Sequence, residues 1–418
     1  MAVAEEAIAI GQRARDAAGA LANLSTDLKN EALVAMADGI EARQDFLLAE
    51  NAKDVAGAKK KGISKAVIDR LTLNPQRVAA MAAAIRDIVG LPDPVRQVTR
   101  QWQRPNGLEV GKMRIPLGVI TIIYEARPNV TADAASLCIK SGNAVILRGS
   151  SDAKHSNQAI GDVLREACAE AGAPEDAVQV VASTDRAMIN ELLKLEEYVD
   201  LVIPRGGEEL IRFVAANSLV PVVKHYKGVC HVYVDSDADL DMAERISLNA
   251  KVQRPSVCNA METLLVHEAV APRFLPDVIG KLRESGVEVR GCDKTRALVG
   301  GIPAASEADW HEEYLDLVLA VRVVADMDEA IEHIRQYGSD HTETIVTADR
   351  GKAEEFIARV NSSAVLVNAS TRFNDGGELG LGAEIGISTS KIHAFGPMGL
   401  EELTSTKFFV YGDGQVRT

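Results

Sequence analysis

Apolar positions in the first hundred residues recur with the spacing of an α-helix. After Thr26, a stripe at intervals of four residues contains Leu28, Ala32, Met36 and Ile40, which predicts an amphipathic helix. This helical region ends in the lysine run 59–61 and Gly62. We interpret the lysines as complementing a helix C-terminus before a glycine cap, and a phosphate site is the alternative.

A second helix in this region has clearly marked ends. Asn74 can cap it and Pro75 suits its first turn. Gly90 and Pro92 then end it. Its apolar stripe consists of Val78, Met81, Ile85 and Ile88.

From about residue 118 the pattern changes to short β-branched runs that alternate with helical segments. The expected strands are 118–126, 142–149, 177–183 and 199–207. This alternation indicates βαβ units and a parallel sheet. Ligands of such sheets bind beyond the C-terminal ends of the strands.

A second alternating region follows Cys258. Its expected strands are 263–267, 287–291, 318–324, 342–348 and 364–368. We place the boundary between the two regions near Gly228. The tail 406–414 predicts one more strand, and a lone terminal strand often finds its partner on another subunit.

The charge and the cysteines narrow the class of protein. A net charge of −14 over 418 residues argues against nucleic acid or an anionic membrane as a partner. The N-terminus carries glutamates where a signal peptide needs lysines, and no stretch is long enough to span a membrane. The cysteines are Cys138, Cys168, Cys230, Cys258 and Cys292. They form no CxxC pair, so neither disulfides nor a zinc site is expected, and a reducing cytoplasm fits.

One cysteine lies in a segment suited to thiol chemistry. In KVQRPSVCNAMETLLVH (251–267), Arg254 and Pro255 interrupt a helical run, and Ser256 could cap the next segment. Cys258 is then expected in the first turn of a new helix or in the loop before it. Free N–H groups, a helix dipole and Arg254 would lower the pKa of the thiol, and the N–H groups could hold an oxyanion. A buried packing cysteine is the alternative.

Two loops at strand ends could cradle a cofactor phosphate. VIPRGG (202–207) places Gly206 and Gly207 at the start of a helix, and ILRGSS (146–151) offers Arg148 as a cation. Neither matches GxGxxG, and tight βα turns also use glycine for steric reasons. GLGAEIG (380–386) follows no clear strand, and we interpret it as a flexible loop.

Basic residues gather in these loops, while the histidines follow no catalytic pattern. The basic residues are Arg148, Lys154, Arg205, Lys224, Lys227 and Arg254. On so acidic a chain this excess suits an anionic ligand, although solvated surface is the alternative for each. His225, His231 and His341 show no metal-ligand or Ser-His-Asp spacing. We interpret them as structural.

Several long blocks resemble the gamma-glutamyl phosphate reductases, also called glutamate-5-semialdehyde dehydrogenases, of proline biosynthesis. The blocks run along nearly the whole chain and keep the family's order. They are RLTLNPQRVAAMAAAIRDIVGLPDPV, RPNGLEVGKMRIPLGVITIIYEARPNVT, DLVIPRGG, VCNAMETLLVH, VVADMDEAIEHIRQYGSDHTETI and ISTSKIHAFGPMGLEELTSTKFFVYGDGQVR.

That family belongs to the aldehyde dehydrogenase superfamily. The resemblance implies an α/β fold with a Rossmann-type cofactor domain, an α/β catalytic domain and a small oligomerisation arm, with the active site between the two domains. We expect the cofactor-binding domain over residues 1–228, with 104–118 a candidate for the arm. The catalytic domain is expected over 229–385, and a return segment with the C-terminal oligomerisation strand over 386–418.

The resemblance also assigns site residues by position. Cys258 falls on the nucleophile, and Glu313 on the glutamate that positions the nicotinamide ribose. The loop containing Ser150 and Ser151 falls on the segment that holds the adenosine ribose. Ser151 replaces the glutamate of NAD-preferring relatives, and Arg148 could attract a 2′-phosphate. NADPH is therefore the expected cofactor.

Three positions depart from the superfamily or family pattern. The glutamate that activates water falls near His225, and its absence suits an acyl-enzyme that accepts hydride instead of water. The oxyanion asparagine falls at Ala126, which leaves the backbone N–H of Cys258, or Asn129, as a candidate. Phe395 stands where the family usually has arginine, so the role of that arginine is not carried over.

The implied reaction is NADPH-dependent reduction of L-glutamyl 5-phosphate to L-glutamate 5-semialdehyde and phosphate through a thioester on Cys258, the second step of proline biosynthesis from glutamate. Arg127, Lys224 and Arg254 are candidates for substrate binding, and no residue is assigned as the acid or base. We expect a homo-oligomer, with glutamate 5-kinase as a pathway partner. A hydrolytic aldehyde dehydrogenase and a non-catalytic protein of the same fold are the alternatives.

Overall fold

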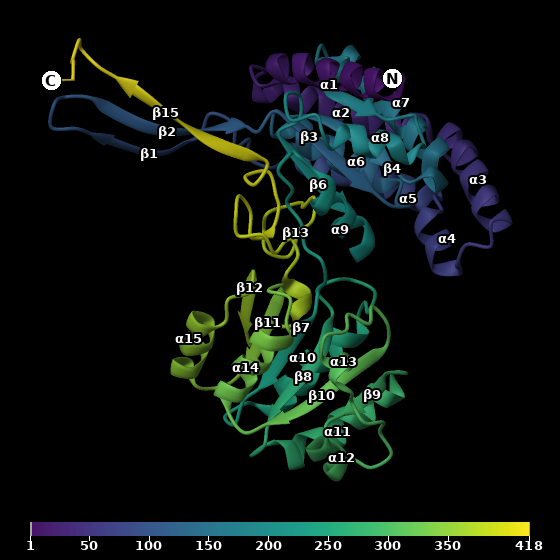
Figure 1. Cartoon of the computed structure of the whole chain (residues 1–418), viewed down its shortest axis with the longest axis vertical. Coiled ribbons are helices and arrows are strands. Elements are labelled where there is room, and N and C mark those ends of the chain that lie inside the picture. The colour runs from purple at the N-terminus through teal and green to yellow at the C-terminus, as the bar shows by residue number, and fades with distance from the viewer. Residues whose placement is uncertain (1, 418) are drawn as a thin grey trace. The chain divides into compact units, whose positions relative to one another are not determined.

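The computed structural model describes residues 2–417 and divides into two compact units, which are described separately (Figure 1). The first unit contains the chain up to Lys224, residues 380–386, and the chain from Met398 onward. The second contains 225–379 and 387–397. The division lies just before the sequence-based boundary at Gly228, and 387–397 belongs to the second unit although the sequence placed it in a return segment. Within 2–417, none of the helices is both long and apolar enough to cross a membrane.

The first unit begins with five helices. They are α1 (Ala2–Leu21), α2 (Thr26–Ala42), α3 (Gln44–Lys60), α4 (Lys65–Leu71) and α5 (Pro75–Val89). The predicted cap of α5 is confirmed, because the Asn74 side chain accepts a hydrogen bond from the N–H of Arg77. The lysine run closes α3, and Gly62 follows at a φ of +69°.

A four-stranded parallel sheet in the order β5-β4-β3-β6 forms the centre of the first unit. Its strands, β3 (Val119–Tyr124), β4 (Ala144–Gly149), β5 (Val178–Val180) and β6 (Leu201–Arg205), lie within the predicted ranges. Its helices are α6 (Asn129–Lys140), α7 (Lys154–Glu170), α8 (Arg186–Leu192) and α9 (Glu208–Asn217), with 3₁₀ turns at 151–153 and 175–177. The chain leaves β3 toward β4 on one side and returns at β6 on the other. A crevice is therefore expected at the C-terminal ends of these strands.

A separate antiparallel sheet in the first unit has the order β1-β2-β15. It contains β1 (Val98–Gln103), β2 (Glu109–Pro116) and β15 (Thr404–Tyr411). The predicted C-terminal strand is present, and it pairs with β2 of its own chain from Thr404 opposite Pro116 to Tyr411 opposite Glu109. The expectation that this strand is alone was wrong. The sequence did not predict β1, because this strand is mostly exposed and lacks an apolar face.

The second unit is built on a six-stranded parallel sheet in the order β12-β11-β7-β8-β10-β9. Its strands are β7 (Cys230–Val234), β8 (Met261–His267), β9 (Glu288–Gly291), β10 (Val318–Val324), β11 (Thr342–Val346) and β12 (Ala364–Val367). Its helices are α10 (Leu240–Val252), α11 (Ala271–Glu284), α12 (Asp293–Leu298), α13 (Glu307–Trp310), α14 (Met327–Tyr337) and α15 (Arg350–Arg359), with a 3₁₀ turn at 371–373. Two short strands, β13 (Ile387–Ser388) and β14 (Gly396–Pro397), pair with each other. Strands β7 and β11 are fully buried and lie side by side, which brings the segments before them together.

Candidate active site

Cys258 lies in the turn that joins α10 to β8. No helix starts within residues 253–260, and the next element is the strand that begins at Met261. The expectation of a new helix at Cys258 was therefore wrong, because the apolar run METLLVH enters the central sheet directly. Cys258 is half-buried. Burial raises the pKa of the thiols of Cys138, Cys168 and Cys230, so these three remain protonated packing residues.

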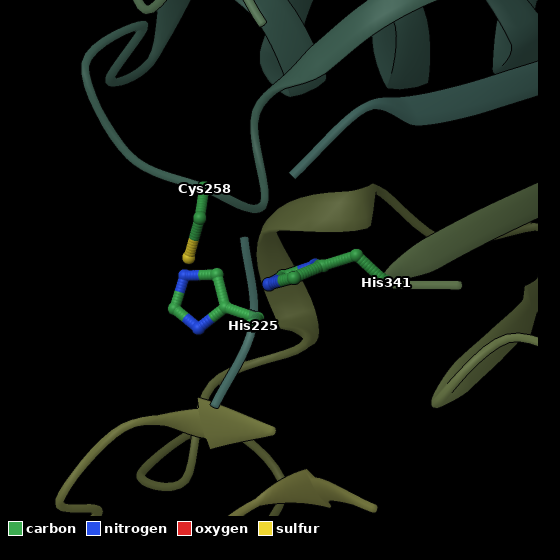
Figure 2. A group of neighbouring side chains, drawn as sticks. All are labelled: His225, Cys258 and His341. Carbon is green, nitrogen blue, oxygen red and sulfur yellow. The ribbon is translucent and has the colours of Figure 1, made fainter. Parts of the chain in front are cut away.

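Two histidines lie beside the Cys258 thiol. The sulfur and one ring nitrogen from each of His225 and His341 all lie within 4.8 Å of one another, and Figure 2 shows a nitrogen of the His225 ring turned toward the sulfur. His225 precedes β7, Cys258 precedes β8 and His341 precedes β11. Since these strands are parallel neighbours, the three side chains meet at the N-terminal edge of the sheet.

The hydrogen bonding of His225 orients its ring. Its Nδ1 is 2.7 Å from the main-chain oxygen of Ile387. A carbonyl oxygen only accepts, so Nδ1 carries the proton of the neutral ring and Nε2 presents its lone pair. Nε2 can therefore accept a proton from the thiol. The sequence analysis interpreted this histidine as structural and did not consider a role beside the thiol. The sequence did offer one signal, because His225 falls near the position where the superfamily has its water-activating glutamate.

His341 is enclosed by a polar network behind the thiol. Its Nδ1 is 2.7 Å from the Thr342 hydroxyl and 3.6 Å from the Cys230 sulfur. The Cys230 thiol donates to the main-chain oxygen of Cys258 at 3.1 Å, and the Asn374 amide donates to Thr342 at 2.8 Å. Burial first, and then the neighbouring His225, lowers the pKa of His341 well below its ordinary value, so this ring is neutral.

The loop of Cys258 is held in place at a glycine. A Cβ added to Gly228 would lie 1.9 Å from the main-chain oxygen of Cys258, so only glycine fits without moving that loop. The N–H of Gly228 donates to the carboxylate of Glu313 at 2.9 Å. In the loop of Glu313, Leu315 has a φ of +51°, which is unusual for leucine, and its N–H donates to buried Glu262 at 3.2 Å. Gly228 therefore contacts both the loop of Cys258 and Glu313, the glutamate that the sequence assigned to the nicotinamide ribose.

Two arginines contribute positive charge near Cys258. Burial lowers the pKa of Arg372, the charge of Arg254 lowers it further, and Cys258 acts in the opposite direction. Arg372 donates to the side chain of Gln253 at 2.9 Å, next to Arg254. The sequence pointed to Arg254 but missed Arg372, which lies in the 3₁₀ turn after β12. A basic residue shortly after the half-buried strand β12 was its signal.

A hollow of about 420 Å³ lies at the predicted crevice of the first unit, a volume typical of small-molecule sites. Its lining includes Ser150 and Ser151, as the sequence predicted, together with Arg186. Asp152 also lines it and pairs with Lys61 at 2.6 Å. The end of the lysine run thus lies beside the expected adenosine-ribose loop.

Arg148 lines the same hollow, as the sequence predicted, and its guanidinium is also bound by the main chain. Its guanidinium donates to three main-chain oxygens, those of Gly149, Thr184 and Asp185, at 3.0, 3.2 and 3.4 Å. The side chain is only 7% exposed. Arg148 therefore ties β4 to the loop after β5, and the more exposed cation of this hollow is Arg186.

The glycine pair at the start of α9 faces a carboxylate. The N–H of Gly207 donates to Glu125 at 3.1 Å, and a Cβ on Gly206 would approach the same side chain to 2.7 Å. The turn therefore accommodates an anionic oxygen, as a phosphate cradle requires. Glu125 would have to leave if a phosphate took its place.

The comparisons with known proteins all indicate the same family. The aldehyde dehydrogenase family model matches residues 1–317. The gamma-glutamyl phosphate reductases of Moorella thermoacetica and Geobacter metallireducens are 58% and 59% identical over 100% of both chains. The solved structure of gamma-glutamyl phosphate reductase from Thermotoga maritima has a TM-score of 0.97 and 47% identity, covering 99% of this chain and 100% of its own.

The chain belongs to the gamma-glutamyl phosphate reductase family. It is therefore an oxidoreductase with the aldehyde dehydrogenase fold, as the sequence blocks predicted.

Several departures from the superfamily pattern can now be placed within this reductase. Ala126 is buried in an apolar cluster with Ala58, Leu71 and Ala153. The Asn129 amide, a candidate oxyanion donor, donates to Asp133 of its own helix at 2.9 Å.

The remaining candidates lie in different parts of the reductase. Arg127 and Lys224 belong to the first unit, and only Arg254 of the three predicted substrate residues lies in the same unit as Cys258. Phe395 is half-buried, and the ammonium of Lys391 lies 5.6 Å from its ring centroid. A cation therefore remains near the position where the family usually has arginine.

Proposed function

We propose that this enzyme reduces L-glutamyl 5-phosphate to L-glutamate 5-semialdehyde and phosphate, with NADPH as reductant and a thioester on Cys258 as intermediate. Full-length relatives named gamma-glutamyl phosphate reductase support the substrate. The observation that carries the chemistry is the half-buried Cys258 thiol beside the nitrogens of His225 and His341. A thiol paired with a base is the arrangement of nucleophilic catalysis.

The first half-reaction makes the thioester. Nε2 of His225 takes the proton of Cys258, and the sulfur attacks the acyl carbon. A C–S bond forms as the bond from that carbon to the phosphate oxygen breaks. The proton held by His225 then passes to the departing phosphate, whose charge Arg254 and Arg372 help to neutralise.

The second half-reaction reduces the thioester. NADPH, when bound, supplies the hydride that converts the acyl carbon to the aldehyde level. The C–S bond then breaks and the sulfur leaves as a thiolate, so the aldehyde is released without water entering the reaction. The first proton left with the phosphate, so His225 takes up a proton from solvent and passes it to the sulfur, which restores the thiol. A histidine bonded to Ile387 suits this shuttle between sulfur and phosphate.

The residues of the first unit fit a nicotinamide cofactor with a 2′-phosphate. The hydroxyls of Ser150 and Ser151 and the guanidinium of Arg186 line the hollow, and Lys61 neutralises Asp152. Arg148, which the sequence predicted for this role, lines the same hollow, and Arg186 is its more exposed cation. We assign the cofactor pyrophosphate to Gly206 and Gly207, and the nicotinamide ribose to Glu313.

The deciding experiment runs the reaction in reverse. Glutamate semialdehyde and NADP are supplied with and without inorganic phosphate, and NADPH formation is followed by absorbance. We expect formation of NADPH only with phosphate, because phosphate must release the acyl group from Cys258. A hydrolytic aldehyde dehydrogenase would work equally well without phosphate, and a non-catalytic protein would show no turnover. Either result would refute the proposal.

The arrangement of the protein in the cell follows from the same proposal. We propose a cytoplasmic homo-oligomer that uses the β1-β2-β15 sheet as its arm. Its substrate would come from a kinase acting on the side-chain carboxylate of glutamate. An acyl phosphate hydrolyses readily, which would favour close contact with that kinase.

A further inference from the structure

The donor atoms around Cys258 match a class of ligand that neither the family nor the proposed reaction requires. Among the residues that the structure describes, His225, Cys258 and His341 are the group of metal-ligating side chains whose donor atoms lie within 4.8 Å of one another. One thiolate and two imidazoles form a soft set that favours zinc over magnesium or calcium. No spacing in the sequence indicated it, because the three residues come from three separate loops.

His341 supplies the second observation. Its side chain is fully buried, and its Nε2 has no hydrogen-bond partner. Figure 2 shows a nitrogen of this ring directed toward His225. When Nδ1 donates its proton to Thr342, Nε2 presents a lone pair toward the cluster. A buried nitrogen left in this state is suited to a ligand that accepts a lone pair.

The outer contacts of both histidines also fit a metal site. Ring nitrogens that bind metals are usually oriented by a hydrogen bond from the other nitrogen to a carbonyl or similar acceptor. His225 has that bond to Ile387 at 2.7 Å, and the Thr342 hydroxyl, 2.7 Å from Nδ1 of His341, can accept the same bond. Both rings are therefore already held as metal ligands are held.

The geometry requires only small movements. Zn–S bonds of about 2.3 Å and Zn–N bonds of about 2.0–2.1 Å place tetrahedral donor atoms about 3.3–3.6 Å apart. The present separations of up to 4.8 Å close to that range by rotation of the half-buried His225 and Cys258 side chains. The second histidine pair, His231 and His333, is less suited to a metal ion. Its ring centroids are 5.4 Å apart, but the cation Arg322 is hydrogen-bonded to His333 and would repel a metal cation.

We propose that Cys258, His225 and His341 form a binding site for Zn²⁺ or a similar soft divalent cation, which reversibly blocks the thiol. Three protein ligands leave the fourth tetrahedral position to water. The inhibition rests on the proposed function of Cys258, but the binding does not. A metal that occupies the sulfur prevents its attack on any acyl group, so the reductase would stop whenever free zinc rises.

The test measures the metal directly on the full-length protein, without substrate. Chelator-treated enzyme is titrated with Zn²⁺ by calorimetry, and with Co²⁺ to detect the sulfur-to-cobalt charge-transfer band. We expect one ion per chain, a thiolate band, and protection of Cys258 from iodoacetamide that a chelator reverses. Absence of binding, or binding without the thiolate band, would overturn the proposal.

The decisive variant is His341→Asn, because the asparagine amide can keep the bond to Thr342 while Nε2 is lost. Its affinity for Zn²⁺ should fall by more than the roughly 10–100-fold that loss of an outer contact costs. His155→Asn, which changes an exposed histidine of the first unit, should bind as the unmodified protein does. Equal affinity in His341→Asn and the unmodified protein would show a site elsewhere. Thermal unfolding of both variants confirms that they fold, and failure of the phosphate-dependent reaction would leave these binding results intact.

Discussion

The two units place their candidate sites at opposite ends of their parallel strands. In the first unit, the hollow lies beyond the C-terminal ends of β3 and β4, where α/β sheets ordinarily bind ligands. In the second unit, His225, Cys258 and His341 precede β7, β8 and β11, so the thiol site lies at the N-terminal edge. The rule that places ligands at the C-terminal ends of parallel strands therefore does not locate the proposed nucleophile, Cys258. A single expectation for both sheets would have missed one of the two sites.

The two sites also differ in what their polar groups do. In the first unit, Arg148 and Gly207 donate hydrogen bonds to main-chain oxygens and to Glu125 respectively, although Arg148 Nε is buried without a partner. In the second, His341 is buried with an unpartnered nitrogen beside the thiol. A buried group without a partner costs free energy, so it persists where function needs it. Only the thiol site combines such a nitrogen with a candidate nucleophile, so it should respond more strongly to substitution.

The largest effect should come from Cys258→Ser. Serine keeps the size of the side chain but not a nucleophile that ionises near neutral pH, so turnover should fall by at least about a thousandfold. Cofactor binding, measured by fluorescence titration, should be unchanged because its ligands lie mainly in the first unit. Cys292→Ser alters the other half-buried cysteine and should keep normal turnover. Near-normal activity in Cys258→Ser would mean that Cys258 is not the nucleophile and that the second unit does not contain the reacting thiol.

His225→Asn should have the next largest effect. The asparagine amide can still donate to Ile387, but no nitrogen is left to take the thiol proton. We expect turnover to fall by about 10²–10⁴-fold. Alkylation of Cys258 by iodoacetamide should slow most near neutral pH, and the deficit should shrink at high pH, where the thiol ionises unaided. An alkylation pH profile identical to that of the unmodified enzyme would contradict the assigned role.

Gly228→Ala tests the support of the thiol loop. The added Cβ would lie 1.9 Å from the oxygen of Cys258 and must displace that loop. A displacement of about 1 Å can cost about 100-fold in rate, so we expect turnover to drop by about 10–100-fold. Gly300→Ala is the matched control, since nothing lies within 4 Å of its Cβ position. If both variants are equally active, the close packing at Gly228 has no catalytic consequence.

The residues changed in these variants differ in how far the sequence could predict them. The strands of both sheets, except β7, were predicted from β-branched runs bounded by turn residues, and Cys258 was proposed from its segment and its family blocks. His225 and Arg372 were missed because their partners are more than thirty and more than one hundred residues away, and only strand order brings them together. Arg148 was placed correctly at a strand end, and it lines the hollow there. The sequence could not show that its guanidinium also donates to the main-chain oxygens of Thr184 and Asp185, because those residues are more than thirty positions away.

Arg186→Ala tests the cofactor side of the comparison. Loss of a charged hydrogen bond to the 2′-phosphate costs about 1.5–3 kcal/mol, so NADPH should bind about 10–100-fold more weakly. NADH, which lacks that phosphate, should be nearly unaffected. Lys154→Ala removes a nearby exposed cation that does not line the hollow and serves as the control. Equal losses for NADPH and NADH would mean that Arg186 does not read the 2′-phosphate.

The smallest effect should come from Asp133→Asn, and it concerns stability. Burial raises the pKa of Asp133 to about 6, from an unfolded value of about 3.8. The folded protein therefore holds this proton more tightly than the unfolded chain, and ionising the group costs stability as pH rises. Relative to the asparagine variant, the unmodified protein should lose stability between about pH 4 and pH 6, by on the order of 1 kcal/mol since partial exposure screens the charge. Above pH 6 the difference should stay constant. Urea unfolding of both proteins across this range measures it, and a difference that does not change with pH would mean that Asn129 and the surrounding charges already compensate the carboxylate.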